Sequence, residues 1–203
     1  MRVREPADVK PLRLLLRHAN AGIRGESKGA DEWRALSPLG WVQAEEVAAR
    51  VGDLPILRIM SSPSLRCRQT VVPLARRLAL DIEPCSELAV DADPGQLVRF
   101  LQDPQTEAAV LCTHRETLET LFTQLALGRT VVPEHDSTME MAATWLLRGA
   151  VGDSSGVHLQ YLPAQRSGSG AAAPSPRADR CSTAHRDGDA RDVSRAQLDR
   201  TVR

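Results

Sequence analysis

The chain has 203 residues, and its 26 basic and 26 acidic side chains give a formal net charge of zero. This length suffices for one domain with a sizeable core, whereas the neutral balance and the 3% of aromatic residues disfavour nucleic-acid binding. The sequence has no secretory signal and no apolar stretch of the roughly 20 residues that a membrane span needs. We therefore expect a cytoplasmic protein with reduced thiols and no membrane contact. None of its four cysteines forms a C-x-x-C pair, so we expect no zinc site.

The first half of the chain alternates apolar runs with amphipathic segments. After a polar stretch over residues 1–11 that we expect to be flexible, the apolar run over 12–16 predicts a strand buried on both faces. A charged, glycine-rich loop over 19–37 follows, and a loop of this length in a compact domain is usually either functional or disordered. The next expected elements are a helix over 38–51, a strand over 56–60 and a helix over 64–78.

Local signals support both helices. Ser37 is a preferred N-cap residue and Pro38 suits the first helical position. Within this first helix, we expect Val42 and Val51 to face the core. Pro73 lies inside the second helix, where it should kink the helix or set its effective start.

The second half of the chain continues the alternation and ends in a hairpin. The expected elements are a strand over 81–84, a loop over 86–94, a helix over 94–101, a strand over 108–112, a helix over 115–127, and antiparallel strands over 137–147 and 157–162. Two-residue alternation from Met139 to Trp145 indicates the first strand of the hairpin. Strands that alternate with helices predict one α/β domain over 12–164 with a mostly parallel sheet.

The composition changes from residue 165 onward. Ser, Gly, Ala, Pro and Arg dominate the segment 165–203, which contains eight arginines and five aspartates but only three large aliphatic residues. Such a composition buries too little apolar surface to offset the entropy of ordering, so we expect a disordered tail. A solvated tail is the simple interpretation, and recruitment of an acidic partner is the alternative.

Chemically capable residues follow four of the predicted strands. These are Arg17-His18, the segment 61–66 with Arg66, Glu87, and His114. The carboxyl ends of parallel strands share one edge of a sheet, where ligands bind, so we expect these side chains to converge. Arginines match phosphate oxygens. One imidazole can attack phosphorus, the other can stabilise developing charge, and a carboxylic acid can protonate the leaving group. The set therefore favours phosphoryl transfer.

Each of these residues also has a simpler interpretation. His18 taken alone could be a strand-end histidine that only contacts a carbonyl group. Glu87 could be an ordinary acidic residue of a surface loop. Arg24, a further candidate ligand from the loop after the first strand, could be solvated, as could Arg68 two residues after Arg66.

Four segments carry a specific resemblance. Leu-Leu-Leu-Arg-His-Ala at 14–19, Leu-Ser-Pro-Leu-Gly-Trp-Val-Gln-Ala at 36–44, Ser-Ser-Pro-Ser-Leu-Arg-Cys-Arg-Gln-Thr at 61–70 and Leu-Cys-Thr-His at 111–114 resemble, in this order, motifs of the histidine phosphatase superfamily, also called phosphoglycerate-mutase-like. The resemblance covers about residues 12–162. It implies a three-layer α/β/α sandwich and a phosphohistidine intermediate on His18. It also implies that Arg17, Arg66 and His114 hold the phosphoryl group and that Glu87 acts as an acid in some branches. No metal or other cofactor is implied, because the cationic pocket supplies the electrostatic stabilisation.

Two positions depart from the family pattern. Ala19 replaces the usual glycine after the first histidine, and alanine would be strained there if the backbone needed a positive φ. Arg115 replaces the usual glycine after the second histidine. This side chain could close the pocket, bind a second phosphate, or point away as part of the first turn of a helix.

The resemblance predicts a phosphatase that acts on a phosphorylated small molecule or a phosphohistidine protein. The pattern of the loop before residue 44 is similar to that of short phosphohistidine phosphatases and of phosphatase domains fused to Nudix hydrolases, although this chain has no Nudix box. Two alternatives stay open. One is a catalytically weak phosphate-binding module, which Ala19 and Arg115 would permit, and the other is a mutase-like phosphoryl transferase. The sequence gives no indication of the oligomeric state.

Overall fold

A mixed β-sheet forms the centre of the computed structural model, which describes residues 12–23, 25, 30–127, 131–133, 139–152 and 157–162. Seven strands are present in these residues, in the order β3-β2-β4-β1-β6-β7-β5. They are β1 (Leu12–Arg17), β2 (Arg58–Ser61), β3 (Ile82–Pro84), β4 (Ala109–Thr113), β5 (Val131–Pro133), β6 (Thr144–Arg148) and β7 (Val157–Leu162). Only β6 is antiparallel to its neighbours β1 and β7, so the other six strands share one direction. The predicted mostly parallel sheet is confirmed.

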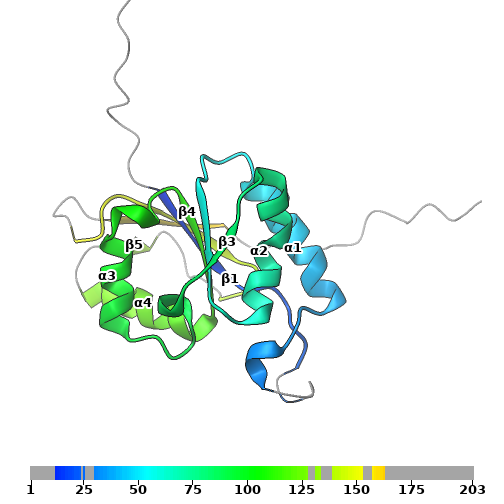
Figure 1. Cartoon of the computed structure of the whole chain (residues 1–203). Coiled ribbons are helices and arrows are strands. Elements are labelled where there is room, and N and C mark those ends of the chain that lie inside the picture. The colour runs from blue at the N-terminus through cyan, green and yellow to red at the C-terminus, as the bar shows by residue number, and fades with distance from the viewer. Residues whose placement is uncertain are drawn as a thin grey trace, which may run out of the picture. The chain divides into compact units, whose positions relative to one another are not determined.

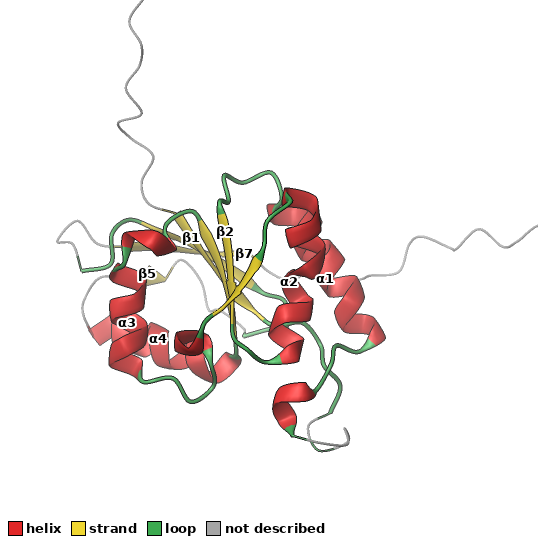
Figure 2. Cartoon of the chain, in the orientation of Figure 1, coloured by secondary structure: helices red, strands yellow, loops and turns green. Residues whose placement is uncertain are grey.

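Helices cover both faces of this sheet (Figures 1 and 2). They are α1 (Pro38–Val51), α2 (Leu65–Leu78), α3 (Pro94–Gln102) and α4 (Arg115–Leu127), with short 3-10 turns η1 (Asp31–Trp33), η2 (Ser86–Leu88) and η3 (Pro104–Thr106). In β1, Leu14 and Leu16 pack in one apolar cluster with α1 and α2, whereas Leu15 packs in a second cluster with α3 and α4. This alternation follows from the two-residue period of a strand. It confirms the three-layer α/β/α arrangement.

The helix starts follow from the expected local signals. The Ser37 side chain accepts a hydrogen bond from the Gly40 amide, with Pro38 at the first helical position of α1. The Asp93 side chain caps α3 in the same way through the Gln96 amide. Pro73 lies inside α2, which continues to Leu78.

Three features differ from the sequence-based expectation. The first strand of the C-terminal hairpin begins only at Thr144, because Ala142 adopts a left-handed φ of 63° that interrupts extended backbone. Val42 is exposed rather than in the core, since the buried side of α1 is formed by Ala44, Val47, Ala48 and Val51. The short strand β5 was not predicted. The segment 1–11, which was expected to be flexible, and the segment 165–203, which was expected to be a disordered tail, lie outside the described residues.

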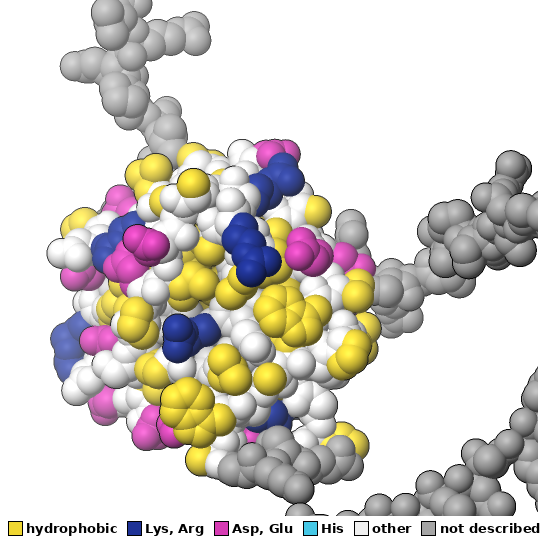
Figure 3. All heavy atoms as spheres, turned by 45° about the vertical axis from the view of Figure 1, so that its right-hand side comes forward, with side chains coloured by type: hydrophobic (Ala, Val, Ile, Leu, Met, Phe, Trp, Pro, Cys, Tyr) yellow, Lys and Arg dark blue, Asp and Glu magenta, His cyan; other side chains and the backbone are white. Residues whose placement is uncertain are grey.

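Neither positive nor negative charge dominates the face of the molecule that Figure 3 shows. Basic and acidic side chains lie interspersed there among apolar ones. This distribution agrees with the formal net charge of zero. Among the described residues, no helix is both long and apolar enough to cross a membrane.

Candidate active site

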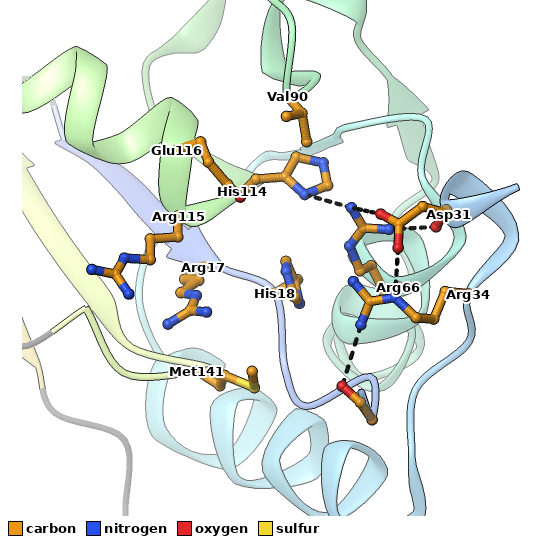
Figure 4. A pocket seen from close by; sticks show the side chains of 11 residues that line it. Arg17, His18, Asp31, Arg34, Arg66, Val90, His114, Arg115, Glu116 and Met141 are labelled. Carbon is orange, nitrogen blue, oxygen red and sulfur yellow. Dashed lines mark hydrogen bonds and ion pairs between the residues drawn. The ribbon is translucent and has the colours of Figure 1, made fainter. Parts of the chain in front are cut away.

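A cavity of about 330 Å³ lies where β1 and β4 end (Figure 4). These two strands are parallel neighbours in which Arg17 pairs with Thr113. His18 and His114, the next residues of the two strands, therefore lie at the same edge of the sheet. The His18 amide donates a hydrogen bond to the Thr113 carbonyl oxygen at 3.0 Å, and the His18 and His114 ring centroids are 5.4 Å apart. The cavity is lined by Arg17, His18, Gly22, Asp31, Arg34, Arg66, Val90, His114, Arg115, Glu116 and Met141.

His18 is buried and has a defined tautomer. Its Nδ1 lies 2.8 Å from the Ala19 carbonyl oxygen, and because a carbonyl oxygen only accepts, Nδ1 must carry the hydrogen. Burial lowers the pKa of His18 to about 4; the Ala19 hydrogen bond opposes this shift, and the Arg66 and Arg17 charges add to it. At neutral pH the imidazole is therefore neutral, with its lone pair on Nε2.

His114 is also held in one tautomer. Its Nδ1 lies 3.1 Å from Arg66 Nη2, and because a guanidinium only donates, Nδ1 must accept. The hydrogen is then on Nε2, which donates to Ser62 Oγ at 2.8 Å. Burial, followed by the charge of Arg66, lowers the pKa of His114 to about 3. Both histidines are thus neutral at pH 7.

Three buried or half-buried guanidinium groups contribute positive charge to the cavity, in addition to the exposed Arg115. Arg66 comes from the first turn of α2 and is 3% exposed, Arg34 follows η1, and Arg17 ends β1. Arg17 Nη1 donates to the Met139 carbonyl oxygen, and burial, together with the nearby Arg115, lowers the pKa of Arg17. Within the described residues, the buried Nε atoms of Arg17 and Arg66 have no hydrogen-bond partner.

Asp31 bridges two of these arginines, as the dashed lines in Figure 4 show. Its Oδ1 accepts from Arg34 Nε at 2.9 Å and its Oδ2 lies 3.1 Å from Arg66 Nη2. The Asp31 main-chain oxygen also accepts from Arg66 Nη1 at 2.7 Å. Arg34 Nη1 in turn donates to the Ala21 carbonyl oxygen at 3.0 Å.

Residues of the sequence motifs that lie outside the cavity hold the loop after β1 in place through hydrogen bonds. The Ala19 amide donates to Thr70 Oγ1 at 2.9 Å, and Thr70 Oγ1 donates to the Arg66 carbonyl oxygen at 2.7 Å. The Ala19 backbone does not adopt a positive φ. The strain considered for an alanine at this position therefore does not arise.

Asn20 connects the same loop to α1. Its amide donates to Gln43 Oε1 at 2.8 Å, and its side-chain oxygen accepts from Ser37 Oγ at 2.6 Å. Gly40 packs so closely on this loop that an added Cβ would lie 1.9 Å from the Asn20 carbonyl oxygen. The Leu36 amide likewise donates to Gln69 Oε1 at 2.8 Å.

The remaining predicted site residues lie at the rim or outside the cavity. Arg115 is the first residue of α4 and lines the cavity, but its side chain is 57% exposed and its Nε donates to Glu119 Oε1 at 2.6 Å. Glu87 lies on η2, does not line the cavity, and accepts a hydrogen bond from Ser86 Oγ at 3.2 Å. Arg24 lies outside the described residues.

Three charged residues of the cavity were not predicted as site residues from the sequence: Asp31, Arg34 and Glu116. Asp31 and Arg34 lie in the loop that was expected to be functional or disordered, and their spacing of three residues is the one signal that pairs them. Among the described residues, no group of three or more His, Cys, Asp or Glu side chains could hold a metal ion. The cavity instead presents guanidinium donors, which suit an anion.

Comparisons with known proteins agree with this geometry. Residues 14–90 match the family model of the histidine phosphatase superfamily (branch 1). A curated relative, the 8-oxo-(d)GTP phosphatase of Mycolicibacterium smegmatis, is 30% identical over 165 residues, which cover 79% of this chain and 50% of the relative. The chain thus spans half the length of that relative.

Solved structures share the fold. The protein histidine phosphatase SixA in complex with tungstate has a TM-score of 0.57 at 22% identity, with 74% of this chain and 94% of that chain covered. A putative phosphohistidine phosphatase from Nakamurella multipartitia has a TM-score of 0.55 at 24% identity, with 75% and 96% covered. A mycobacterial glucosyl-3-phosphoglycerate phosphatase has a TM-score of 0.51 at 18% identity, with 74% and 96% covered.

Proposed function

Since the chain belongs to the histidine phosphatase superfamily, we propose that it is a phosphatase that hydrolyses a phosphomonoester or a phosphohistidine through a covalent intermediate on His18. The observation that carries this proposal is the state of His18. Its Nδ1 hydrogen is engaged by the Ala19 carbonyl oxygen, and its low pKa of about 4 keeps Nε2 unprotonated at neutral pH. A neutral imidazole beside buried guanidinium groups is suited to attack an anionic phosphoryl group.

The reaction takes place in two displacements. The Nε2 lone pair of His18 attacks phosphorus, the N–P bond forms, and the bond from phosphorus to the leaving oxygen or nitrogen breaks as that atom keeps the electron pair and takes up a proton. Water then attacks phosphorus and loses a proton, the N–P bond to His18 breaks, and inorganic phosphate is released. His18 returns to its neutral state.

The cationic residues stabilise both displacements. Arg17, Arg34 and Arg66 line the cavity with His18, and guanidinium groups neutralise the charge on the equatorial oxygens of a transferring phosphoryl group. His114, whose ring lies edge-on to His18, contacts the same phosphoryl group. Because His114 is neutral, it leaves the positive charge to the arginines.

The leaving group separates two substrate classes. Glu87 does not line the cavity, so protonation of an alcohol leaving group falls to Glu116 at the rim or to solvent. A phosphoramidate nitrogen can already be protonated before the N–P bond breaks, and a phosphohistidine protein therefore needs no enzymic acid. The likeness to phosphohistidine phosphatase folds is in keeping with this class.

A nucleotide is the second candidate substrate. The curated relative named as an 8-oxo-(d)GTP phosphatase is 30% identical to this chain, and Arg115 stands at the cavity rim, where its guanidinium would bind a second phosphate group. Arginine suits such a contact because its planar fork pairs with two phosphate oxygens.

A trapping experiment tests the intermediate. The purified protein is incubated with radiolabelled phosphohistidine, acetyl phosphate or a nucleoside diphosphate, quenched in alkali, and compared with His18→Ala. We expect acid-labile, alkali-stable label on the wild type and none on the variant. His158→Ala is the matched control, because His158 is an exposed histidine of β7 outside the cavity, and it should retain the label.

The same experiment distinguishes the alternatives. Release of label as inorganic phosphate indicates a phosphatase, whereas transfer to an added metabolite would indicate a mutase-like transferase. The donor that labels fastest identifies the substrate class. A folded wild type that takes no label from any donor, and turns none over, would contradict the proposal and favour a phosphate-binding module.

A further inference from the structure

Asp31 is a carboxylate inside a cavity that is built to bind an anion. We propose that Asp31 is a positioning residue that holds the guanidinium groups of Arg34 and Arg66 in place for the transferring phosphoryl group. The assignment rests on the phosphatase function proposed above and adds a residue that does not itself touch the substrate. Asp31 acts through the two arginines that it bridges (Figure 4).

The bridge fixes Arg66 from two directions. Asp31 Oδ2 lies 3.1 Å from Arg66 Nη2, and the Asp31 main-chain oxygen accepts from Arg66 Nη1 at 2.7 Å. A free arginine side chain has several rotatable bonds, and ordering it costs conformational entropy. Because Asp31 orders Arg66 before substrate arrives, this cost does not fall on substrate binding.

Burial makes this contact necessary. The Arg66 side chain is 4% exposed, whereas Asp31 is 32% exposed. A buried cation without a counter-charge is strongly unfavourable, so Arg66 would otherwise shift toward solvent in the substrate-free enzyme. The second pair, from Arg34 Nε to Asp31 Oδ1 at 2.9 Å, fixes Arg34 relative to Arg66.

The effect extends to His114. Arg66 Nη2 also contacts His114 Nδ1 at 3.1 Å, and this contact, together with Ser62 Oγ at His114 Nε2, sets the tautomer of the ring. These contacts engage both Nη atoms of Arg66, whereas its buried Nε has no hydrogen-bond partner among the described residues.

The charge balance is consistent with the same role. The four guanidinium groups that line the cavity, of Arg17, Arg34, Arg66 and Arg115, carry four positive charges, and the carboxylates of Asp31 and Glu116 carry two negative charges. This leaves two positive charges around two neutral histidines. This remainder matches a phosphoryl dianion. The competing interpretation is that Asp31 occupies the anion site and that the substrate must displace it.

Substitution of Asp31 distinguishes these interpretations. In Asp31→Asn the amide oxygen can still accept from one guanidinium, but the amide NH₂ opposes the other. We expect kcat with p-nitrophenyl phosphate to fall, and the Kd for inorganic phosphate measured by calorimetry to rise, each by about ten- to a hundredfold, the size of one lost charge-assisted hydrogen bond. Asp31→Glu, which keeps the charge, should recover part of both losses.

Glu32→Gln is the matched control, because it removes the same charge from the next residue of η1, which does not line the cavity. We expect wild-type kcat and phosphate affinity for this variant. Tighter phosphate binding by Asp31→Asn would overturn the proposal and indicate a displaced anion. Equal losses in Glu32→Gln would also overturn it, because the effect would then be one of general charge.

The phosphate affinity is measured without turnover, so failure of this assignment is separate from failure of the proposed function. A wild type that binds phosphate but never labels His18 would contradict the phosphatase mechanism. In that case a weaker phosphate affinity of Asp31→Asn would still support the positioning role. Thermal melting of each variant verifies that it is folded.

Discussion

At the scale of single residues, hydrogen-bond partners decide what each histidine can do. The Ala19 carbonyl oxygen accepts from His18 Nδ1 and leaves the lone pair on Nε2. Arg66 and Ser62 give His114 the opposite tautomer, with the hydrogen on Nε2. Two histidines in one cavity are therefore not equivalent, and the difference arises from one acceptor and one donor placed beside them.

Ser62 is expected to be important for activity although it carries no charge. In Ser62→Ala, His114 Nε2 loses its acceptor at 2.8 Å, and the ring is free to exchange the nitrogen that faces Arg66. We predict that kcat with p-nitrophenyl phosphate falls by about two- to tenfold, in line with the roughly 0.5–1.5 kcal/mol of one buried hydrogen bond. Steady-state kinetics of the variant gives the measurement.

Ser61→Ala provides the comparison for this change. Ser61 is also fully buried at the end of β2, but its Oγ donates to the Ser62 carbonyl oxygen and not to a histidine. A smaller decrease in kcat is expected for this variant. Equal kcat values for Ser62→Ala and wild type, with both proteins folded, would refute the tautomer argument.

At the scale of elements, the loop after β1 is held by α1 and α2 together. The Asn20 amide donates to Gln43 of α1, and the Ala19 amide donates to Thr70 of α2. These contacts give a structural role to the side chains of Gln43 and Thr70, which belong to the sequence motifs but lie outside the cavity. They hold the backbone next to His18 in place.

Gly40→Ala tests this support. The added Cβ would lie 1.9 Å from the Asn20 carbonyl oxygen, so either α1 or the loop must move. We predict a loss of about 1–3 kcal/mol in the free energy of unfolding, the range for overpacking, together with a lower kcat. Urea unfolding and steady-state kinetics measure the two effects.

Gly95→Ala is the matched control in another helix. An added Cβ at Gly95 would lie 3.2 Å from a side-chain oxygen of Asp93, near the start of α3. Because alanine favours helix over glycine by about 0.5–1 kcal/mol, we expect stability that is unchanged or slightly higher. If Gly40→Ala were as stable as this control, close packing of α1 on Asn20 would not matter.

Elements with strong local signals could be predicted from the sequence. The bounds of α1 and α4 match the expected ranges 38–51 and 115–127. A capping serine and a proline mark the start of α1, and apolar periodicity indicates the length of both helices. His18 and His114 could also be predicted to lie at strand ends, because an apolar run leads directly into each of them. Parallel pairing of β1 with β4 then brings them together.

Features that depend on tertiary contacts could not be predicted in this way. The alternation before Thr144 suggested a longer strand, but the left-handed backbone of Ala142 interrupts it. The role of Asp31 depends on Arg66, which is 35 residues away in the chain, and no periodicity signals such a pair. Glu87 follows β3 as expected, yet its position on η2 leaves it outside the cavity lining.

At the scale of the whole molecule, the site has an energetic consequence for stability. The folded protein keeps His18 and His114 neutral, because burial lowers their pKa values from 6.5 to about 4 and about 3. In the unfolded chain both imidazoles take up a proton near pH 6.5. The unfolded state therefore binds more protons than the folded state as the pH falls below 6.5.

We predict that the free energy of unfolding falls between pH 6.5 and about 4 by about 1.4 kcal/mol per pH unit for each of the two histidines. Above pH 6.5 neither histidine contributes to the pH dependence. Urea unfolding at several pH values, compared with the double variant His18→Asn and His114→Asn, isolates this contribution, because acidic residues titrate alike in both proteins. The double variant should lose less stability per pH unit in this window. Parallel pH profiles for the two proteins would mean that the histidines protonate freely in the fold, and His18 would then be largely cationic at pH 5 and unable to attack phosphorus.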